Sequence, residues 1–279
     1  MQRMAGLING ILTNSPAAKQ SIGGIGIGVP GVLDLEKGST RFLPNLPGNW
    51  PDIPLAATIQ DQTSLPVHLL NDVRGITYGE WKFGAGQGAS DMVCFAIGTG
   101  IGGGVVINNQ LILGIGGTAG ELGHITVDIN GQLCGCGNHG CVETYASGPA
   151  ITAAGIKAVT QGLTTSIGKM ADYDLNKITP ELIAKAAQGG DPIAKDIYHQ
   201  AGVALGVAVA NVLVTLGPRR VVFGGGVARA GKLLLNTIRQ TIDTRVKMMP
   251  VDQVELFQAK LGDNAGIIGV AMWASHRIG

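Results

Sequence analysis

Charged residues are scarce in this chain: Asp, Glu, Lys and Arg make up only 14% of its 279 residues, and the formal net charge is +1. The 20 basic residues form no cluster comparable to a nucleic-acid-binding face, so we expect no nucleic-acid partner. Hydrophobic residues make up 45% of the chain, which predicts extensive burial in one large domain or two smaller ones.

Signals for export and membrane insertion are also lacking. The N-terminal segment has no basic region followed by an apolar stretch and a cleavage site, which argues against a signal peptide. The most apolar long segment, residues 201–216, is short for a membrane span and contains Asn211 and Thr215, so we predict a buried helix. We therefore expect a cytoplasmic protein with no membrane partner, in a compartment where disulfides are rare.

Glycine, in contrast, is abundant, with 45 residues. They are spread through apolar segments without a Gly-X-Y period, which excludes a collagen-like chain. Glycine lets the backbone turn sharply and approach other groups closely. We therefore expect many turns and loops that face a ligand.

Predicted strands alternate with predicted helices, which indicates an α/β fold. Apolar residues at helical spacing predict a helix that starts near Asn71 and helices over residues 1–14, 179–188, 194–216, 232–246 and 262–274. Short apolar runs predict strands over residues 22–29, 65–70, 92–97, 104–107 and 220–223. Residues 41–54 and 131–140, rich in turn-forming residues, predict loops.

Cysteines are few, but three of the four lie close together, in LGHITVDINGQLCGCGNHGCVE. Cys134, Cys136 and Cys141 with His124 supply one Cys₃His set, a usual closed tetrahedral zinc site. A disulfide would leave one of the three unpaired, and free thiols in so polar a loop would be poorly buried. The sequence therefore predicts a structural zinc ion, whereas Cys94, inside a predicted strand, is interpreted as a core residue.

Acidic residues flank the predicted zinc loop. Glu121 lies three residues before His124, and Glu143 lies two residues after Cys141. Carboxylates and an imidazole on a rigid rim suit sugar hydroxyls, which both donate and accept hydrogen bonds. Each Glu could instead support a zinc ligand or be an ordinary solvated residue, and the spacing leaves both interpretations open.

Asn71 and Asp72 directly follow a predicted strand. Asn and Asp are favoured helix N-caps, which is the structural interpretation. The functional alternative is a general base at the carboxyl end of the strand, where α/β folds bind their ligands. The spacing does not decide between them.

Two glycine-rich turns follow predicted strands. In GTGIGGG, residues 98–104, five glycines in seven residues would let phosphate oxygens approach the backbone N–H groups. No Gly-Lys-Ser/Thr follows, so it is not a Walker A loop, and it lacks the strand-to-helix context of a dinucleotide fingerprint. Residues 224–226 form a strand-to-helix turn that could pass under a nucleotide base. The alternative for each is a plain glycine turn.

These features together resemble the ROK family of repressors, unassigned reading frames and sugar kinases. The most specific stretch is GTAGELGH at 117–124 followed by the CGCGNHGC loop and ETYASG, and the resemblance extends from GIGIGVPGVLD to LGDNAGIIGVA. NLPGNW at 45–50 is similar to a segment of the glucokinase branch. The resemblance implies an actin-like, RNase H-like two-lobed ATPase fold that assembles as a homodimer or homotetramer. We expect a small lobe of residues 1–73 plus 263–279, and a large lobe of residues 74–262 with the zinc loop, the nucleotide site and the oligomer interface.

The same resemblance implies a role for each matching residue. Asp72 would be the catalytic base. A hexose would contact Gly31, Asn45, Asn71, Asp72, Glu121, His124 and Glu143. ATP, with magnesium, would contact Gly98, Thr99, Gly100, Gly102, Gly103, Gly224, Gly225 and Gly226. His124 would bind zinc through one ring nitrogen and the sugar through the other.

One family motif does not occur in the sequence. Family kinases begin with a strand that ends in Asp-x-Gly-Gly-Thr and meets the ATP phosphates and magnesium, and these 279 residues contain no such motif. We therefore expect a small lobe truncated at its N-terminus. Either part of the protein is missing from this sequence, or the protein is a naturally shortened form whose exposed sheet edge another chain would need to cover. The expected activity is ATP-dependent phosphorylation of a hexose at its 6-hydroxyl, glucose first. The alternatives are a catalytically impaired sugar-binding relic and a sugar-sensing regulator without a DNA-binding domain.

Overall fold

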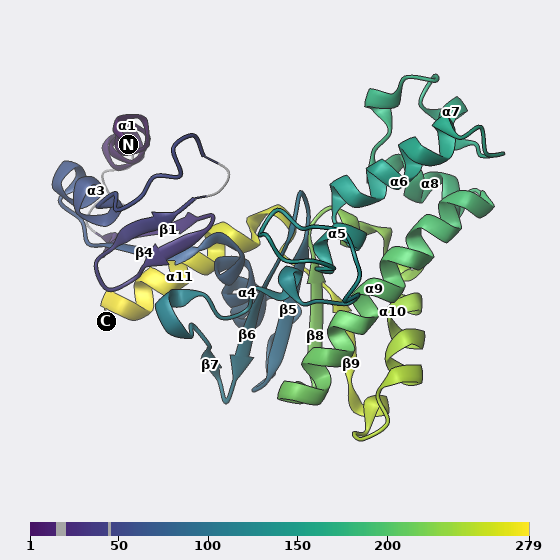
Figure 1. Ribbon diagram of the computed structural model, residues 1–279. Coiled ribbons are helices and arrows are strands. Elements are labelled where there is room, and N and C mark those ends of the chain that lie inside the picture. Colours follow the sequence, from purple (N-terminus) through teal and green to yellow (C-terminus); the bar gives the residue numbers. More distant parts are fainter. Residues whose placement is uncertain (15–20, 44–45, 279) are drawn as a thin grey trace. The chain divides into compact units, whose positions relative to one another are not determined.

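The chain forms two compact units in the computed structural model, which describes residues 1–14, 21–43 and 46–278 (Figure 1). Unit 1 comprises Met1–Gly88, Leu111–Gly120 and Asp263–Gly279. Unit 2 comprises Ala89–Gln110 and Glu121–Gly262. These boundaries differ from the expected lobes, because residues 74–88 and 111–120 belong to unit 1.

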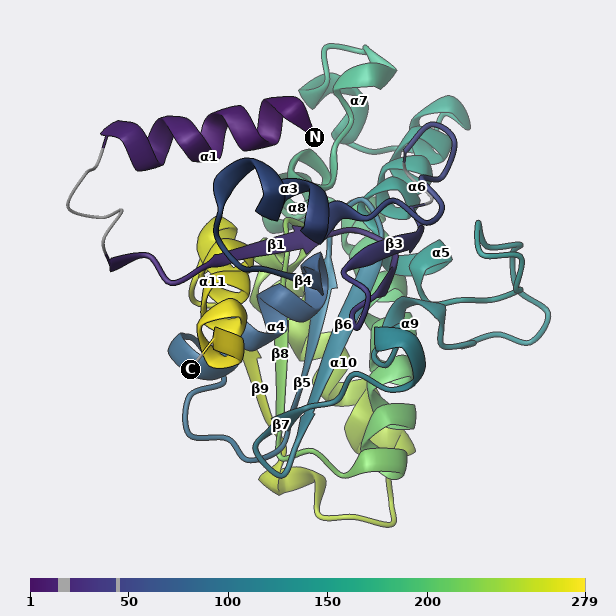
Figure 2. The same cartoon turned by 90° about the vertical axis from the view of Figure 1, so that its left-hand side faces the viewer.

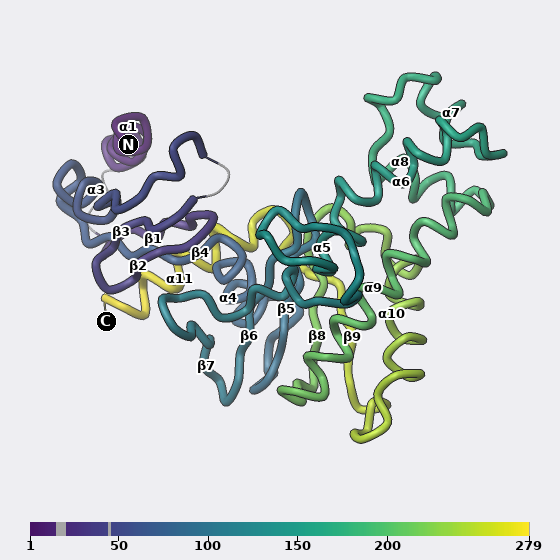
Figure 3. Tube along the Cα trace, viewed as in Figure 1, coloured from purple at the N-terminus to yellow at the C-terminus, as the bar shows by residue number. Residues whose placement is uncertain are grey.

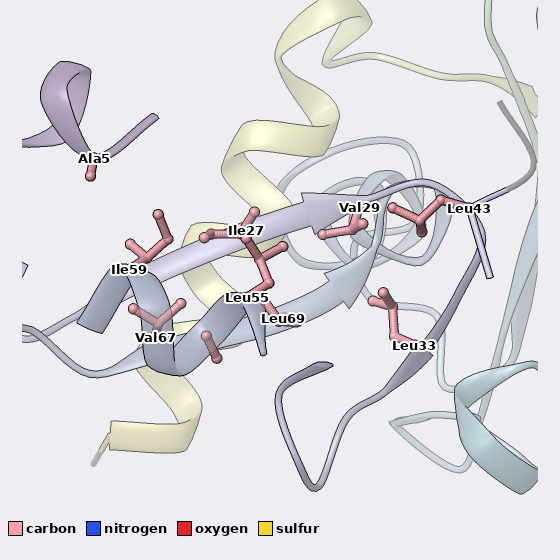
Figure 4. Packing of buried hydrophobic residues seen from close by; sticks show 10 residues of the cluster. Ala5, Ile27, Val29, Leu33, Leu43, Leu55, Ile59, Val67 and Leu69 are labelled. Atoms are coloured by element: carbon pink, nitrogen blue, oxygen red, sulfur yellow. The ribbon is translucent and has the colours of Figure 1, made fainter. Parts of the chain in front are cut away.

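Unit 1 is built on two parallel strands, with Ile25 paired to Val67 and Val29 paired to Asn71. Its helices and strands are α1 (Gln2–Asn14), β1 (Ile25–Val29), β2 (Val32–Asp34), β3 (Ser39–Phe42), α3 (Leu55–Thr63), β4 (Val67–Asn71), α4 (Asp72–Phe83), η1 (Ile115–Gly117) and α11 (Ala265–Ile278). Apolar side chains of β1 and β4 pack with those of α3 into one buried cluster, which includes Ile27, Ile59 and Leu69 (Figure 4). The β2–β3 hairpin is antiparallel.

Glycines explain why α4 belongs to unit 1. A Cβ atom on Gly269 of α11 would lie 1.8 Å from the carbonyl oxygen of Gly75, and one on Gly79 would lie 2.4 Å from that of Ala265. Both distances are far inside van der Waals contact, so only glycine permits this approach. The close packing of α4 on α11 holds residues 74–83 in unit 1.

Unit 2 is an α/β unit with a five-stranded sheet of order β7-β6-β5-β8-β9, which Figure 3 traces. Its strands are β5 (Met92–Ile97), β6 (Ile101–Ile107), β8 (Arg220–Gly224), β9 (Glu255–Gln258) and β7 (Gln110–Leu111), whose second residue falls in unit 1. Its α-helices are α5 (Glu143–Ala146), α6 (Gly148–Thr160), α7 (Ile167–Met170), α8 (Pro180–Gln188), α9 (Pro192–Leu216) and α10 (Lys232–Arg245). β5 is antiparallel to β6 and parallel to β8. Every residue of β5 is buried, so this strand is the centre of the unit.

Most predicted elements are present, with shifted ends. The predicted partner strand 104–107 begins earlier, because β6 starts at Ile101. Gly102 and Gly103 therefore pair with Ala96 and Phe95 within the sheet, and the predicted glycine turn is confined to residues 98–100. The prediction of a loop over residues 41–54 was wrong at its start, since β3 extends to Phe42.

The apolar segment predicted as a buried helix is part of α9. Among the described residues, this helix alone is long and apolar enough to cross a membrane, and 61% of its apolar window is buried inside the protein. Gly202 and Gly206 of α9 pack against Thr237 and Thr241 of α10, where a Cβ would lie 2.7 and 2.4 Å from the threonine Cβ atoms. The packing is that of a core helix.

Asp191 caps α9 and should make the protein less stable in acid. Its Oδ1 accepts a hydrogen bond from the Ala194 N–H, and its Oδ2 accepts from the hydroxyls of Thr165 and Ser166. Burial raises the pKa of this carboxyl, but these bonds lower it more, from the ordinary 3.8 to about 2. Because the folded pKa is the lower one, the stabilisation is present above about pH 4 and is lost as the pH falls towards 2.

Asp191→Asn should therefore lower the free energy of unfolding by about 2 kcal/mol at pH 7. About half of this difference between the variant and the wild type should remain at pH 3, because the wild-type carboxylate is then losing its advantage. Urea unfolding of both proteins at pH 7, 5 and 3 measures the difference. A difference that stays constant over this range would show that ionised Asp191 is not the source of the stability.

Candidate functional site

Four potential metal ligands converge in unit 2. The ligand atoms of His124, Cys134, Cys136 and Cys141 all lie within 4.8 Å of one another. The Sγ atoms of Cys136 and Cys141 are 3.7 Å apart, and His124 Nδ1 is 3.7 Å from Cys134 Sγ. Tetrahedral zinc with bonds of about 2.3 Å to sulfur and 2.0–2.1 Å to nitrogen places neighbouring ligand atoms about 3.5–3.8 Å apart. The four side chains therefore fit a closed zinc site.

Glycine and backbone hydrogen bonds shape the loop that carries these ligands. Gly137 and Gly140 have φ values of +89° and +68°, in the left-handed region that favours glycine. A Cβ on Gly140 would lie 1.7 Å from the Asp128 carbonyl oxygen. The Cys134 N–H donates to the Asn138 carbonyl, which closes a tight turn around Cys136. The prediction of a loop with little regular structure is confirmed, since only isolated bridges occur there.

Burial determines the protonation state of one thiol of the loop. Cys141 is fully buried, and this burial, with hydrogen bonds to the other two thiols, raises its pKa to about 12. Without a cation Cys141 therefore stays a neutral thiol near pH 7. A metal ion would stabilise the thiolate and release the proton.

The two ring nitrogens of His124 face different neighbours. Nδ1 faces Cys134, while Nε2 lies 4.0 Å from the Oε2 atom of Glu121. Both side chains are partly exposed, with 33% of the His124 side chain and 45% of the Glu121 side chain accessible. The two nitrogens therefore lie on different sides of the ring, Nδ1 towards the cysteine cluster and Nε2 towards the Glu121 carboxylate.

Glu143 links the cysteine loop to the glycine turn. Its Oε2 accepts a hydrogen bond of 2.7 Å from the Ile101 N–H, and its Oε1 lies 3.9 Å from Cys134 Sγ. A Cβ on Gly100 would lie 2.5 Å from Glu143 Oε2, so a larger residue there would displace the Glu143 carboxylate. The spacing of Glu143 from Cys141 did not predict this hydrogen bond to the Ile101 N–H.

The two glycine turns lie at the carboxyl ends of neighbouring parallel strands. Ala96 of β5 pairs with Gly224 of β8, and the strands run side by side in Figure 2. The chain turns at Gly98 after β5 and at Gly225 after β8, where φ is +87°. The structure thus places residues 98–100 and 224–226 at one edge of the sheet. Ligands of α/β folds bind at such an edge.

Asn71, Asp72 and Gly31 lie together in unit 1. Asn71 is the N-cap of α4, and its Oδ1 accepts from the Val73 and Arg74 N–H groups. Its Nδ2 donates to the Gly31 carbonyl at 3.2 Å. Asp72 is the first residue of α4, and its Oδ1 accepts from the Val73 N–H at 2.9 Å. The capping interpretation is confirmed for Asn71.

The residues predicted to contact a sugar belong to both units. Gly31, Asn71 and Asp72 are in unit 1, whereas Glu121, His124 and Glu143 are in unit 2. The predicted contact Asn45 lies outside the described residues.

The fold is the actin-like, RNase H-like ATPase fold that the sequence predicts, as its structural neighbours show. The chain belongs to the ROK family: the model described as "ROK family" matches residues 2–277.

Its relatives include enzymes and regulators. A glucokinase of Halalkalibacterium halodurans is 36% identical over 260 residues, which cover 92% of this chain and 78% of the relative. A xylose repressor of Caldicellulosiruptor bescii is 33% identical over 273 residues, which cover 98% of this chain and 67% of the relative. The crystal structure of a ROK family glucokinase from Streptomyces griseus with glucose and AMPPNP matches with a TM-score of 0.82 and 33% identity, over 97% of this chain and 88% of that one.

Proposed function

We propose that this protein is an ATP-dependent hexose kinase that phosphorylates the 6-hydroxyl, with glucose as the first candidate substrate. The observation that carries the proposal is the position of Asp72, a carboxylate at the carboxyl end of β4 beside Asn71 and Gly31. A carboxylate at such a strand end is well placed to act as a general base. The similarity to glucokinases, one of them crystallised with glucose and AMPPNP, supports the choice of reaction.

In the proposed reaction, Asp72 accepts the proton of the sugar 6-hydroxyl as that oxygen attacks the γ-phosphorus of ATP. The new oxygen–phosphorus bond forms while the bond to the β–γ bridging oxygen breaks, and ADP leaves. Most of the rate comes from positioning and electrostatic stabilisation. The proposed sugar contacts, in addition to Asp72, are Gly31, Asn45, Asn71, Glu121, His124 and Glu143.

ATP would bind at the carboxyl edge of the unit 2 sheet. The turn over residues 98–100, in which the Gly98 N–H donates to the Gly100 carbonyl, would approach its phosphates, and residues 224–226 would lie beside the adenosine. Gly102 and Gly103, also proposed as ATP contacts, lie within β6. Magnesium, bound with ATP, would neutralise charge on the phosphates.

The Cys₃His cluster would hold a structural zinc ion, because its four protein ligands leave no open position for substrate. Its role would be to order the loop that bears His124 and to keep His124 Nε2 turned towards the sugar.

We further propose that units 1 and 2 are the small and large lobes. A cytoplasmic homodimer or homotetramer is the proposed state of the protein.

A sugar-sensing regulator is the second candidate, favoured by the xylose repressor that is similar over 98% of the chain. A coupled assay with ATP and glucose, mannose, fructose, allose or N-acetylmannosamine separates the two candidates. We expect turnover of about 1 s⁻¹ or more with glucose. Glucose binding without turnover would exclude the kinase and leave a sugar-binding relic or a regulator. Salt-dependent binding to duplex DNA would then favour the regulator.

A further inference from the structure

Arg74, in the first turn of α4, is a charged side chain in an unusual place. It is 1% exposed and is one of the largest fully buried side chains in the described residues. Burying a guanidinium is costly unless its N–H groups find acceptors. The surroundings of Arg74, close to Asp72 at the start of α4, must therefore supply such acceptors.

Three of its donors bind oxygen atoms. Nη1 donates to Asn71 Oδ1 at 2.9 Å, Nε donates to the Ala119 carbonyl at 2.9 Å, and Nη2 donates to the Thr118 carbonyl at 3.0 Å. The acceptors come from two segments more than 40 residues apart in sequence, and both segments belong to unit 1. Arg74 therefore connects the end of β4 to residues 117–120 (GTAG) through side-chain hydrogen bonds.

This contact fixes how the Asn71 amide is turned. Its Oδ1 now accepts three hydrogen bonds, from the N–H groups of Val73 and Arg74 and from the Arg74 guanidinium. With the oxygen held in this way, the amide NH₂ must face the other side, where it donates to the Gly31 carbonyl. The remaining Nδ2 hydrogen then has a set direction for a sugar hydroxyl.

We propose that Arg74 is a positioning residue for hexose binding, acting through Asn71 and the Thr118–Ala119 carbonyls. The inference rests on the proposed function, since it takes Asn71 and Gly31 as sugar contacts. A lysine would keep the charge but not the planar fork: its three N–H donors leave from one nitrogen, whereas Nε, Nη1 and Nη2 of Arg74 each reach a different acceptor. A methionine of similar length would fill the space without any donor.

The test compares Arg74→Met and Arg74→Lys with Thr77→Val, a matched control. Thr77 lies on the same helix, is fully buried and bonds only within α4, to the Val73 carbonyl. Steady-state kinetics should show the KM for glucose raised about 10- to 100-fold in both Arg74 variants, the loss expected for a charge-assisted hydrogen bond. The KM for ATP and kcat should stay within about threefold of wild type. Thr77→Val should leave all three values unchanged.

Calorimetric titration of glucose without ATP gives a second measurement that does not depend on turnover. The Kd should rise by the same factor in both Arg74 variants, including Arg74→Lys if Arg74→Met fails to fold. Variants that lose only thermal stability, with the Kd and KM for glucose unchanged, would show that Arg74 is structural and overturn the inference. If the wild type binds glucose without phosphorylating it, the kinase proposal fails while the Kd values still test Arg74. If it binds no hexose, both proposals fall.

Discussion

Asp72→Asn should lower kcat with glucose by about 10²- to 10⁴-fold while the Kd for glucose changes little. A positioned general base contributes this much to a rate, and asparagine cannot accept the proton of the attacking hydroxyl. The fold should survive, because the Asp72 Oδ1 accepts a hydrogen bond from the Val73 N–H that an asparagine oxygen can also accept. A coupled assay gives kcat, and calorimetry with glucose gives the Kd.

Asp61→Asn is the matched control for this variant. Asp61 is an exposed carboxylate of α3, in the same unit, so its replacement removes the same charge away from the proposed site. It should turn over glucose at the wild-type rate. Turnover of Asp72→Asn within about threefold of wild type would mean that another group takes the proton, since loss of a general base costs far more.

Strong local patterns explain which elements could be predicted. Six consecutive apolar residues gave the strand Met92–Ile97 with its observed bounds. Helix α3 was missed, because it is short and begins after Pro54 with no side-chain cap. The first glycine turn was predicted to extend to residue 104, which included Gly102 and Gly103, because glycine carries no side chain to mark a strand. Pairing with β5, which the sequence does not display, decides that they belong to β6.

In the candidate site too, features with a local sequence pattern could be predicted, whereas contacts between distant segments could not. The metal ligands could be predicted because their residue types and close spacing carry the signal, and the structure brings all four together. The bond from the Ile101 N–H to Glu143 spans 42 residues, and the bond from Arg74 to the Thr118 carbonyl spans 44. No local pattern reports such pairs. A buried arginine next to Asn-Asp looks, in sequence, like any charged residue of a helix.

Removal of zinc should abolish turnover, and the protein as purified should contain one zinc ion per chain. The loop over residues 126–141 has only two isolated bridges as regular structure, and its other support comes from single hydrogen bonds such as that from the Cys134 N–H to the Asn138 carbonyl. Structural zinc contributes roughly 10–16 kcal/mol of apparent binding free energy, far more than such a loop gains from its own contacts. After chelation we expect at least about a 100-fold loss of kcat/KM for glucose, as for other losses of positioning. Elemental analysis and the coupled assay measure the two quantities.

Cys136→Ser tests the role of the metal without changing the packing of buried side chains. Cys136 is exposed, unlike Cys134 and Cys141, so a serine there opens no cavity and removes only a thiolate ligand. It should lose zinc and turnover together. Cys94→Ala is its counterpart: Cys94 is fully buried in β5, away from the cluster, so this variant should lose some stability and keep one zinc ion and near-normal turnover. A metal-free protein with wild-type turnover, or a Cys136→Ser protein that keeps its zinc, would contradict the proposed site, because a closed tetrahedron needs all four ligands.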